Sequence, residues 1–408
     1  MNFLAQARDI HPDLVRLRRE LHQIPELGLA LPRTQDLVLT ELDQLPLEIS
    51  TGAGLSSVTA VLRGGAGGSS GDRPVVLLRG DMDALPVTER TGAAFSSRHD
   101  GVMHACGHDL HTAGLVGAAR LLSERRAELA GDVVFMFQPG EEGFDGAGHM
   151  IAEGVLDAAG RPVDAAYGLH VTSSMIHRGR FTCRPGTLMA ASAGLFVRVL
   201  GAGGHGSRPH AALDPVQVAC ELVTALQTMV TRRFDVFDPV VITVGVFHAG
   251  TKRNIIPDEA SFEATVRAFR SRTLEQVGDH VDVLCRNLAA GYGMQVEVRF
   301  EAEYPATVND PAEHDFVAST VAEVFGDERF EYLDNPLTGS EDFSRVLDRV
   351  PGAYLFLGAC ASDAPDSAPA NHSPRAVFDD SVLGDGAALL AELAVRRIAR
   401  PERSAGVG

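Results

Sequence analysis

The order of apolar segments constrains the fold more than any other feature, because strands and helices leave different periods in a sequence. In the first half, short apolar runs suited to buried strands alternate with stretches of helical periodicity. The runs are VVLLRGD (75–81), DVVFMFQP (132–139) and AAYGLHV (165–171), and the clearest helical stretch covers 110–129. Strands that alternate with helices build βαβ units, so this half predicts a mostly parallel sheet with helices on both faces.

Between about 190 and 305 the pattern changes to strand, helix, strand, strand, helix and strand. This βαββαβ order is that of the ferredoxin-like unit, which is self-contained. The first pattern then resumes with a helix, the apolar run AYLFLGA (353–359) and a final helix near 383–400. The sequence therefore predicts an α/β fold in which a large domain, 1–187 and 305–408, carries an inserted ferredoxin-like domain at 188–304.

Two glycine-rich stretches match functional motifs but stand in the wrong context. GGSSG (67–71) fits the nucleophile motif of serine hydrolases, yet it joins two strand-like segments instead of a strand and a helix. GAGGHG (201–206) fits the dinucleotide-binding motif, but no helix opens directly after it. We therefore expect ordinary turns at both places, with 64–72 forming a flexible hairpin tip.

The formal net charge of -18 argues against partners that need a basic surface, namely nucleic acids and anionic membranes. No apolar run approaches the roughly 18 residues of a membrane span. The N-terminal segment alternates charged and apolar residues without the features of a secretory signal, so we expect a cytoplasmic protein. The scattered cysteines are then expected to be free thiols.

Side chains that bind metal ions gather in a few short segments, most of them at the ends of predicted strands. The segments are RGDMDALP (Asp81, Asp83), HACGHD (His104, Cys106, His108, Asp109), QPGEEG (Glu141, Glu142), GLHV (His170) and NHSP (His372). Ligands bind parallel sheets at the carboxyl ends of the strands, so we expect these segments to meet there. Each alone has an ordinary explanation, such as a buried thiol or a solvated turn. Together they indicate a metal site.

Two ions suit these residues better than one. Cys106 and His108 are two residues apart and can face the same side, and a thiolate held between two cations can bridge them. The outer ligands would be Glu142, His170 and His372. The adjacent Glu141 would then remain unligated and able to move a proton. A set of thiolate, imidazole and carboxylate donors accepts Zn, Mn, Co or Ni.

Taken together, the motifs resemble a known family. The strings RGDMDALP, GVMHACGHDLH, QPGEEG, GLHV, GGHGSRPH, NIIP, GSEDF and HSP stand in the order of the M20 metallopeptidases, in their amidohydrolase branch. That branch contains aminoacylases, hippurate hydrolase, N-acetyl-diaminopimelate deacetylase and plant auxin–amino acid conjugate hydrolases. The resemblance implies two divalent ions per subunit. It also implies a homodimer or larger assembly formed through the inserted domain, which closes over the substrate as a lid.

The resemblance also implies roles for single residues in the large domain. Cys106 matches the bridging ligand, and the matching terminal ligands are His108, Glu142, His170 and His372. Glu141 matches the general base that activates water, and Asp83 matches the acid that orients the site. Peptidase branches carry a histidine ligand where this chain has Asp81, so the ligand role does not transfer to Asp81.

In the inserted domain, His205 matches a residue that reaches the active site of a dimer mate and stabilises the oxyanion. Asn254 and Arg267 match groups that hold a substrate carboxylate, which suits a planar guanidinium. Without the family, His205 is better explained as a turn residue and Arg267 as a solvated strand charge. Glu341, in GSEDF, stands in a segment that the resemblance places along the substrate pocket.

The function implied is hydrolysis of the amide bond of N-acyl-L-amino acids to a carboxylic acid and a free amino acid. The same machinery cuts peptide bonds, so a dipeptidase or carboxypeptidase is the second hypothesis; the HACGHD form favours the amidohydrolase. A third is an inactive homologue that binds a ligand in the crevice. A fourth is a thiol hydrolase with Cys106 as nucleophile and His108 as its partner, which would survive chelation.

Overall fold

The computed structural model describes residues 3–66 and 73–400, which form two compact units. Within this part of the chain, unit 1 runs up to Leu188 and also takes Val308–Asn335 and the residues from Arg345 onward, while unit 2 takes Met189–Thr307 and Pro336–Ser344. Pro336–Ser344 departs from the predicted division. It joins unit 2, where the N–H of Ala190 donates to the carbonyls of Leu337 and Gly339.

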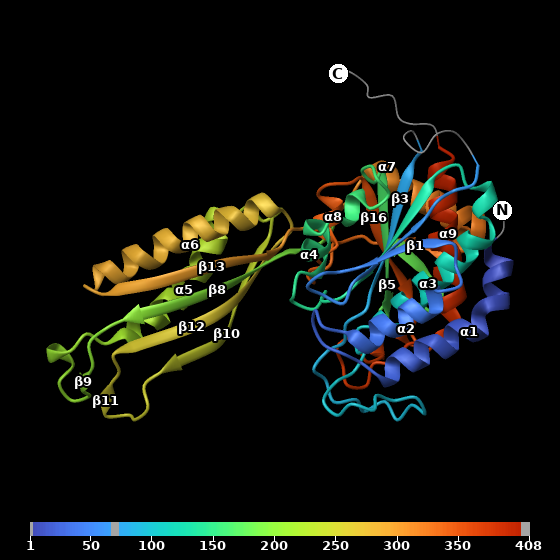
Figure 1. Cartoon of the computed structure of the whole chain (residues 1–408). Coiled ribbons are helices and arrows are strands. Elements are labelled where there is room, and N and C mark those ends of the chain that lie inside the picture. Colours follow the sequence, from blue (N-terminus) through green and yellow to red (C-terminus); the bar gives the residue numbers. More distant parts are fainter. Residues whose placement is uncertain (1–2, 67–72, 401–408) are drawn as a thin grey trace, which may run out of the picture. The chain divides into compact units, whose positions relative to one another are not determined.

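Unit 1 is built on an eight-stranded sheet with a parallel centre (Figure 1). In spatial order its strands are β1 (Leu47–Thr51), β2 (Val58–Leu62), β4 (Asp132–Gln138), β3 (Val75–Asp81), β5 (Ala165–Thr172), β16 (Gly352–Gly358), β6 (Phe181–Cys183) and β15 (Phe330–Tyr332). Strands β4, β3, β5 and β16 are parallel to their neighbours in this run. Every residue of β3, β4 and β16 is buried, as expected for strands covered on both faces.

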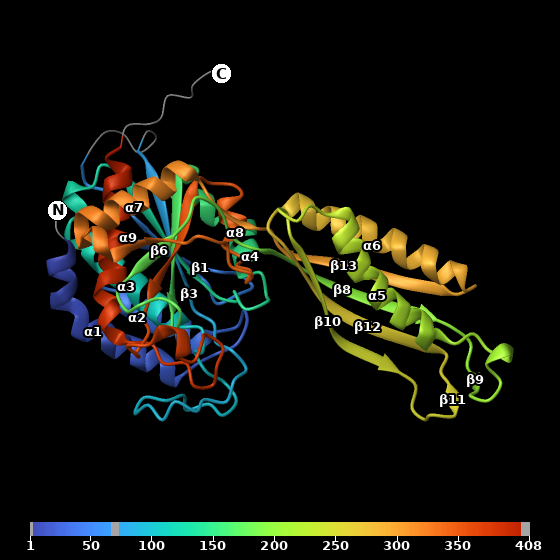
Figure 2. The same ribbon diagram turned by 180° about the vertical axis from the view of Figure 1, so that it is seen from behind.

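Helices flank this sheet. They are α1 (Phe3–Gln23), α2 (Pro32–Leu42), α3 (His108–Glu124), α4 (Gly146–Ala152), α7 (Pro311–Phe325) and α9 (Leu383–Ile398), with the short α8 (Ser344–Leu347) where the chain re-enters unit 1. Helices α3 and α9 pack on the central strands, and α1 packs on both of them, so the first and last helices lie side by side (Figure 2). Among the residues that the structure describes, no helix is both long and apolar enough to cross a membrane.

The strands on either side of residues 64–72 do not form the hairpin that the composition of this segment predicts. Strand β4 lies between β2 and β3, so the two strands joined by this segment do not pair. Sequence proximity favours a hairpin, but β2 pairs antiparallel with β4, which comes later in the chain. Residues 67–72 of the glycine-rich stretch lie outside the described part of the chain.

Unit 2 has the predicted ferredoxin-like topology. Its antiparallel sheet has the order β10 (Val240–Ala249), β12 (Glu259–Ala268), β8 (Ala191–Leu200) and β13 (Gln295–Tyr304), with α5 (Pro215–Arg233) and α6 (Ser271–Gly291) packed on it. Strand β12 alternates exposed and buried residues, which leaves one face for the helices. Helix α5 begins where the Asp214 side chain accepts the N–H of Val216 at 3.0 Å, with Pro215 in the first turn.

Two short ladders complete the fold. Strands β9 (Gly204–His205) and β11 (Ile255–Ile256) pair at one end of unit 2. Strands β7 (Gly186–Met189) and β14 (Thr307–Asn309) pair where the chain passes from one unit to the other. The α/β fold with a mostly parallel sheet and an inserted βαββαβ domain is therefore confirmed. The five cysteines are free thiols, as expected.

Candidate metal centre

The segments singled out in unit 1 meet at the carboxyl ends of its parallel strands. Asp81 ends β3, Glu141 and Glu142 follow β4, and His170 lies near the end of β5. The loop before α3 contributes Cys106, with His108 as the first residue of that helix, and His372 lies in the loop after β16. These side chains therefore gather at the carboxyl ends of parallel strands, which is where ligands bind such sheets.

Cys106 stands at the centre of the cluster. Its Sγ lies 3.4 Å from Nε2 of His170 and 3.3 Å from Nε2 of His372. The thiol belongs to two groups whose donor atoms are close enough to hold an ion, one with His108 and His170 and the other with Glu142 and His372. Two groups that share one sulfur are the arrangement that a bridging ligand between two ions requires.

The side chain of His108 tests whether these residues fit a metal ion. Its Nδ1 lies 2.9 Å from the backbone carbonyl oxygen of Asp83, and a carbonyl can only accept, so Nδ1 carries a proton. Its Nε2 is buried and makes no hydrogen bond, with Oδ2 of Asp81 3.5 Å away. A buried nitrogen without a partner costs free energy, and an ion bound at Nε2 would remove that cost. The residues therefore fit divalent metal ions.

Asp83 fixes the two glutamates. Its carboxylate accepts the backbone N–H of Glu141 at Oδ1 and that of Glu142 at Oδ2, both at 3.0 Å. Asp83 is buried, so these hydrogen bonds are not exchanged with water. Through them and through its carbonyl contact with His108, Asp83 holds the backbone of Glu141 and Glu142 and the ring of His108. It takes part in neither ion-binding group that contains Cys106.

Opposite charges face one another inside the cluster. Hydrogen bonds with Cys106 and Glu142 raise the pKa of His372 to about 10. Burial alone would raise the pKa of Glu142, but the hydrogen bond from His372 holds it below the usual value; Nε2 of His372 and Oε1 of Glu142 are 3.2 Å apart. Burial and the nearby His111 keep the pKa of His170 well below its usual range, so this ring is neutral.

Asp81 is engaged on both carboxylate oxygens. Nη1 of the buried Arg79 lies 2.7 Å from Oδ2, and Nδ1 of His111 lies 2.5 Å from Oδ1. Burial opposes its ionisation, but Arg79 and the histidines His108 and His111 hold the pKa of Asp81 well below the usual value. The side chain therefore stays charged and occupied within the protein.

The loop that carries Cys106 approaches β5 closely at a glycine. Gly107 has φ of +88°, and a Cβ at this position would lie 2.5 Å from Cγ2 of Val171. Only glycine satisfies both the left-handed backbone and the short approach. This residue therefore lets the loop bring Cys106 and His108 to the end of β5.

Two residues that sequence analysis did not select hold the cluster from behind. Nδ2 of Asn371 donates to the carbonyls of Cys106 and Val171, each at 3.1 Å, and its Oδ1 accepts the N–H of Ser173 at 2.9 Å. His111 bonds both Asp81 and Val171. The only feature of the sequence that could have indicated them is their position: Asn371 precedes His372, and His111 lies one turn after His108. Neither residue is distinguishable from an ordinary polar residue without the tertiary contacts.

The candidate residues of the inserted domain lie far apart within unit 2. His205 and Asn254 are neighbours at the β9–β11 end, where the N–H of Gly206 donates to the carbonyl of Asn254 at 2.9 Å. Arg267 lies on β12 opposite Ser192. Glu259, which pairs with Leu200, lies at the opposite end of the same strand. Nη1 of Arg267 is 3.6 Å from Oε2 of Glu303.

The surroundings of His205 define its ring proton. The backbone N–H of Ser207 donates to Nδ1 of His205 at 3.2 Å, so that nitrogen is an acceptor and the proton sits on Nε2. The side chain is exposed, which leaves this N–H available to a ligand. Glu341 also belongs to unit 2, is buried, and accepts the N–H of Phe343 at 2.9 Å.

Comparison with known proteins adds to this geometry. The model of peptidase family M20/M25/M40 matches residues 77–396. Thermostable carboxypeptidase 1 of Saccharolobus solfataricus is 37% identical over 95% of this chain and 96% of its own length. N-acetylcysteine deacetylase of Bacillus subtilis is 34% identical over 94% of this chain and 97% of its own.

A solved structure is similar over the whole fold. It is that of a dinuclear metal-binding peptidase of the M20 family from Bacillus subtilis, 31% identical, with a TM-score of 0.80. The alignment covers 96% of this chain and 99% of that one. The similarity thus includes both the unit that carries the cluster and the inserted unit.

Proposed function

This chain belongs to peptidase family M20/M25/M40 and is a metal-dependent hydrolase, and we propose that it cleaves the amide bond of N-acyl-L-amino acids. The products would be a carboxylic acid and a free amino acid. The observation that carries the proposal is the position of Cys106 in two ion-binding groups, beside a glutamate that belongs to neither. The similarity to N-acetylcysteine deacetylase supports the acylated substrate.

Each side chain of the cluster would have a distinct role. Cys106 would bridge two divalent ions, with His108 and His170 on one and Glu142 and His372 on the other. Such ions lower the pKa of water and polarise a carbonyl group. Glu141 would take the proton from the attacking water and return it to the leaving amine. Asp83 keeps Glu141 in place through its backbone N–H.

Residues of the inserted domain would bind the rest of the substrate. Nε2–H of His205 is suited to donate to the oxygen that becomes negative during attack, because its other nitrogen is occupied by Ser207. Asn254 lies beside His205. Asn254 and Arg267 would hold the free carboxylate of the amino acid.

One chain does not bring all of these groups to one substrate. Along β12, Arg267 is eight residues from Glu259, which pairs with Leu200 at the end nearer His205. At about 3.3 Å per residue this is roughly 26 Å, longer than an N-acyl amino acid. We therefore place His205 and Asn254 in the active site of a second copy, which makes the homodimer part of the proposal.

The edge strand β10 supports self-association. Within the described chain it pairs with β12 alone, and its sequence VVITVGVFHA has no lysine, arginine, aspartate or glutamate. Val241, Val246 and Phe247 on this strand are 46%, 36% and 39% exposed. A long, apolar edge without charge or proline is a template for pairing with another strand. The opposite edge, β13, carries Glu and Arg residues and is protected.

A carboxypeptidase or dipeptidase is the second candidate, favoured by the similarity to thermostable carboxypeptidase 1. The test is amine release from N-acetyl-, N-benzoyl- and chloroacetyl-amino acids and from free dipeptides. Metal-depleted protein would be assayed alone and with Zn, Mn, Co or Ni restored. We expect metal-dependent release from the acylated amino acids, with dipeptides poor substrates.

The other outcomes of this experiment separate the alternatives. Release from dipeptides alone would assign the chain to the peptidases. Full activity after chelation would point to Cys106 as a nucleophile instead of a ligand. No release with any metal or substrate would favour a homologue that only binds its ligand. A cytoplasmic location remains a prediction.

A further inference from the structure

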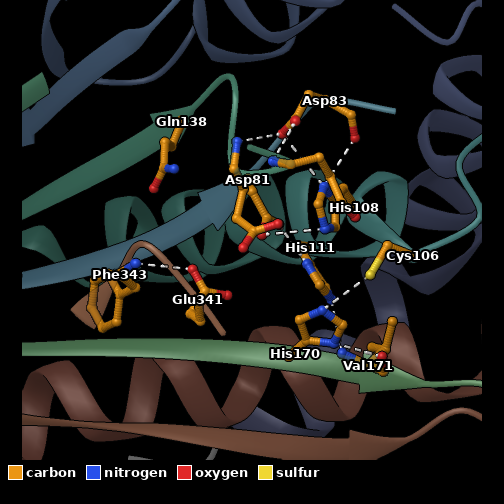
Figure 3. Close-up of polar contacts among 12 residues, drawn as sticks. Asp81, Asp83, Cys106, His108, His111, Gln138, His170, Val171, Glu341 and Phe343 are labelled. Carbon is orange, nitrogen blue, oxygen red and sulfur yellow. Dashed lines mark hydrogen bonds and ion pairs between the residues drawn. The ribbon is translucent and has the colours of Figure 1, made fainter. Parts of the chain in front are cut away.

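The ring of His111 packs against that of His170. His111 belongs to neither of the two ion-binding groups that contain Cys106. The two ring centroids are 4.6 Å apart, and the ring of His111 lies between Asp81 and His170 (Figure 3). His111 is buried, on the second turn of α3.

The hydrogen bonds of His111 fix its tautomer. The backbone N–H of Val171 lies 2.8 Å from Nε2 of His111, and a peptide N–H can only donate. Nε2 is therefore the unprotonated nitrogen, and the ring proton sits on Nδ1, 2.5 Å from Oδ1 of Asp81. His111 thus links a fixed carboxylate to the backbone of β5.

The hydrogen bond from Val171 to His111 replaces one that a neighbouring strand would otherwise accept. Strand β3 pairs with β5 only from Val76 opposite Ala165 to Arg79 opposite Gly168, whereas β5 continues to Thr172 along β16. Beyond Gly168 the β3 side of β5 therefore lacks a strand partner. The side chain of His111 supplies the acceptor that Val171 would otherwise lack in the interior.

The other polar group of Val171 sets the orientation of His170. Its carbonyl oxygen lies 2.7 Å from Nδ1 of His170 and 3.1 Å from Nδ2 of Asn371. A carbonyl can only accept, so Nδ1 of His170 carries the proton. Nε2 of His170 then presents its lone pair 3.4 Å from Sγ of Cys106. Val171 is thereby held through both its N–H and its carbonyl.

The far end of the link is rigid. Asp81 is bound through Oδ2 to Nη1 of Arg79 at 2.7 Å, and Nε of Arg79 donates to Oε1 of Gln138 at 2.9 Å. All three side chains are buried. Asp81, His108 and His111 also lie close enough to hold an ion, but both nitrogens of His111 are occupied, so that group is not a third metal site.

We propose that His111 is a positioning residue: anchored by Asp81 and Arg79, it fixes the backbone of β5 at Val171 and thereby selects the His170 tautomer whose Nε2 can bind a divalent ion. The Val171 carbonyl is the hydrogen-bond partner of the His170 ring, and loss of such a partner typically costs roughly 10- to 100-fold in metal affinity. The inference rests on the proposed metal centre, but its first test does not.

The first test uses the metal-free wild-type protein with 15N-labelled histidine. Two-bond 15N–1H correlation spectra should give a neutral ring protonated at Nδ1 for both His111 and His170. The assignments would come from spectra of His111→Gln and His170→Gln. A proton on Nε2 of either ring in the wild type would overturn the proposal, whatever the variants do.

The second test separates the acceptor from the rest of the ring. Glutamine can place an oxygen near the position of Nε2, whereas asparagine reaches only the position of Nδ1, and phenylalanine offers no acceptor. Titrating metal-free protein with Zn²⁺ against a competing chelator should give wild-type-like binding of two ions for His111→Gln. For His111→Asn and His111→Phe, one ion should bind about 10- to 100-fold more weakly, with the other unchanged.

A matched control measures the general cost of removing a buried imidazole. His314 is a buried histidine of α7 whose Nδ1 bonds Asp315 at 3.0 Å, and His314→Gln should bind both ions like the wild type. Excess Zn²⁺ should restore part of kcat in His111→Phe, because the defect lies in affinity. Wild-type binding of both ions by a folded His111→Phe would refute this inference alone. Failure of the wild type itself to bind ions would refute the proposed function.

Discussion

At the scale of single residues, the adjacent Glu141 and Glu142 occupy different surroundings although Asp83 holds both. Glu142 faces His372 and shares an ion-binding group with Cys106. Glu141 is buried and lies outside both groups that contain the thiol. A carboxylate ligand next to a carboxylate that can act as a base is what proton transfer beside a metal ion requires.

Replacing Glu141 with glutamine tests whether Glu141 is the general base. Because an amide cannot take a proton from water, kcat should fall by roughly 100- to 10,000-fold. Metal content, measured by atomic absorption, should stay at the wild-type level, since Glu141 belongs to neither thiol-containing group. Near-normal turnover by Glu141→Gln would remove Glu141 from the role of base.

At the scale of elements, the loop before α3 is fixed on two sides. On the β5 side, Gly107 permits the close approach to Val171. On the other side, Asp109 of α3 bonds α1, where Nε of Arg18 and Nδ1 of His22 lie 2.7 and 2.8 Å from its Oδ2. The first helix of the chain therefore helps to place the segment that carries Cys106 and His108.

A pair of glycine variants separates backbone strain from steric contact in this loop. Gly107→Ala and Gly101→Ala both force a left-handed residue, with φ of +88° and +78°, but nothing lies within 4 Å of a Cβ at Gly101. Both should lose stability, and Gly107→Ala should lose about 1–3 kcal/mol more in the free energy of urea unfolding, because of overpacking against Val171. Equal losses would contradict a role for the close approach.

The link between α1 and the rest of unit 1 also predicts a pH dependence. Burial would raise the pKa of Glu89, but hydrogen bonds from His22, Thr91 and the N–H of Ser97 outweigh it and lower that pKa to about 2. A lowered carboxyl pKa adds stability that is fully present above the ordinary value of 4.5 and is lost as the pH falls toward 2.

Glu89→Gln should therefore unfold more easily than the wild type at pH 7, by about 1–3 kcal/mol for hydrogen bonds lost to a charged group. The difference should shrink when urea unfolding is repeated at steps from pH 5 toward pH 3. Glu20→Gln is the control, because Glu20 is exposed and pairs only at the surface with Arg16. A difference that is independent of pH would contradict the contribution of the ionised carboxylate.

At the scale of the whole molecule, the separation of His205 and Arg267 within unit 2 is the basis of the proposal that two chains share each active site. Each site would combine the metal cluster of one copy with His205 and Asn254 of another. A two-fold pairing of β10 edges would supply both sites at once, because the same surface then serves both copies. Activity should therefore depend on association.

Mixing two inactive variants tests this arrangement. His205→Ala keeps a complete metal cluster, and Glu141→Gln keeps a complete His205, so a mixed dimer contains one intact site. After unfolding and refolding together with metal, random pairing should restore about a quarter of wild-type activity, since half of the dimers carry one working site of two. Each variant refolded alone is the control. No recovery in a mixture proven to exchange subunits would contradict the shared site.

The sequence by itself determined the types of the elements and their order. Period-2 and period-3.6 patterns are local, because each depends only on which side of a strand or helix a residue faces. These patterns were enough to predict the mostly parallel sheet and the inserted βαββαβ domain. They also led to the expectation that Cys106, His170 and His372 gather at one sheet edge. The family resemblance, carried by whole motifs, is likewise confirmed.

Only the tertiary structure decided how those elements lie beside one another. The position of β4 between β2 and β3 depends on pairing between distant segments, as does the membership of residues 336–344 in unit 2. The roles inferred for His111 and Asn371 depend on single hydrogen bonds to Val171, made by side chains that no local pattern distinguishes. A period records which face a residue takes, whereas a site depends on which distant backbone groups are left for its side chain to satisfy.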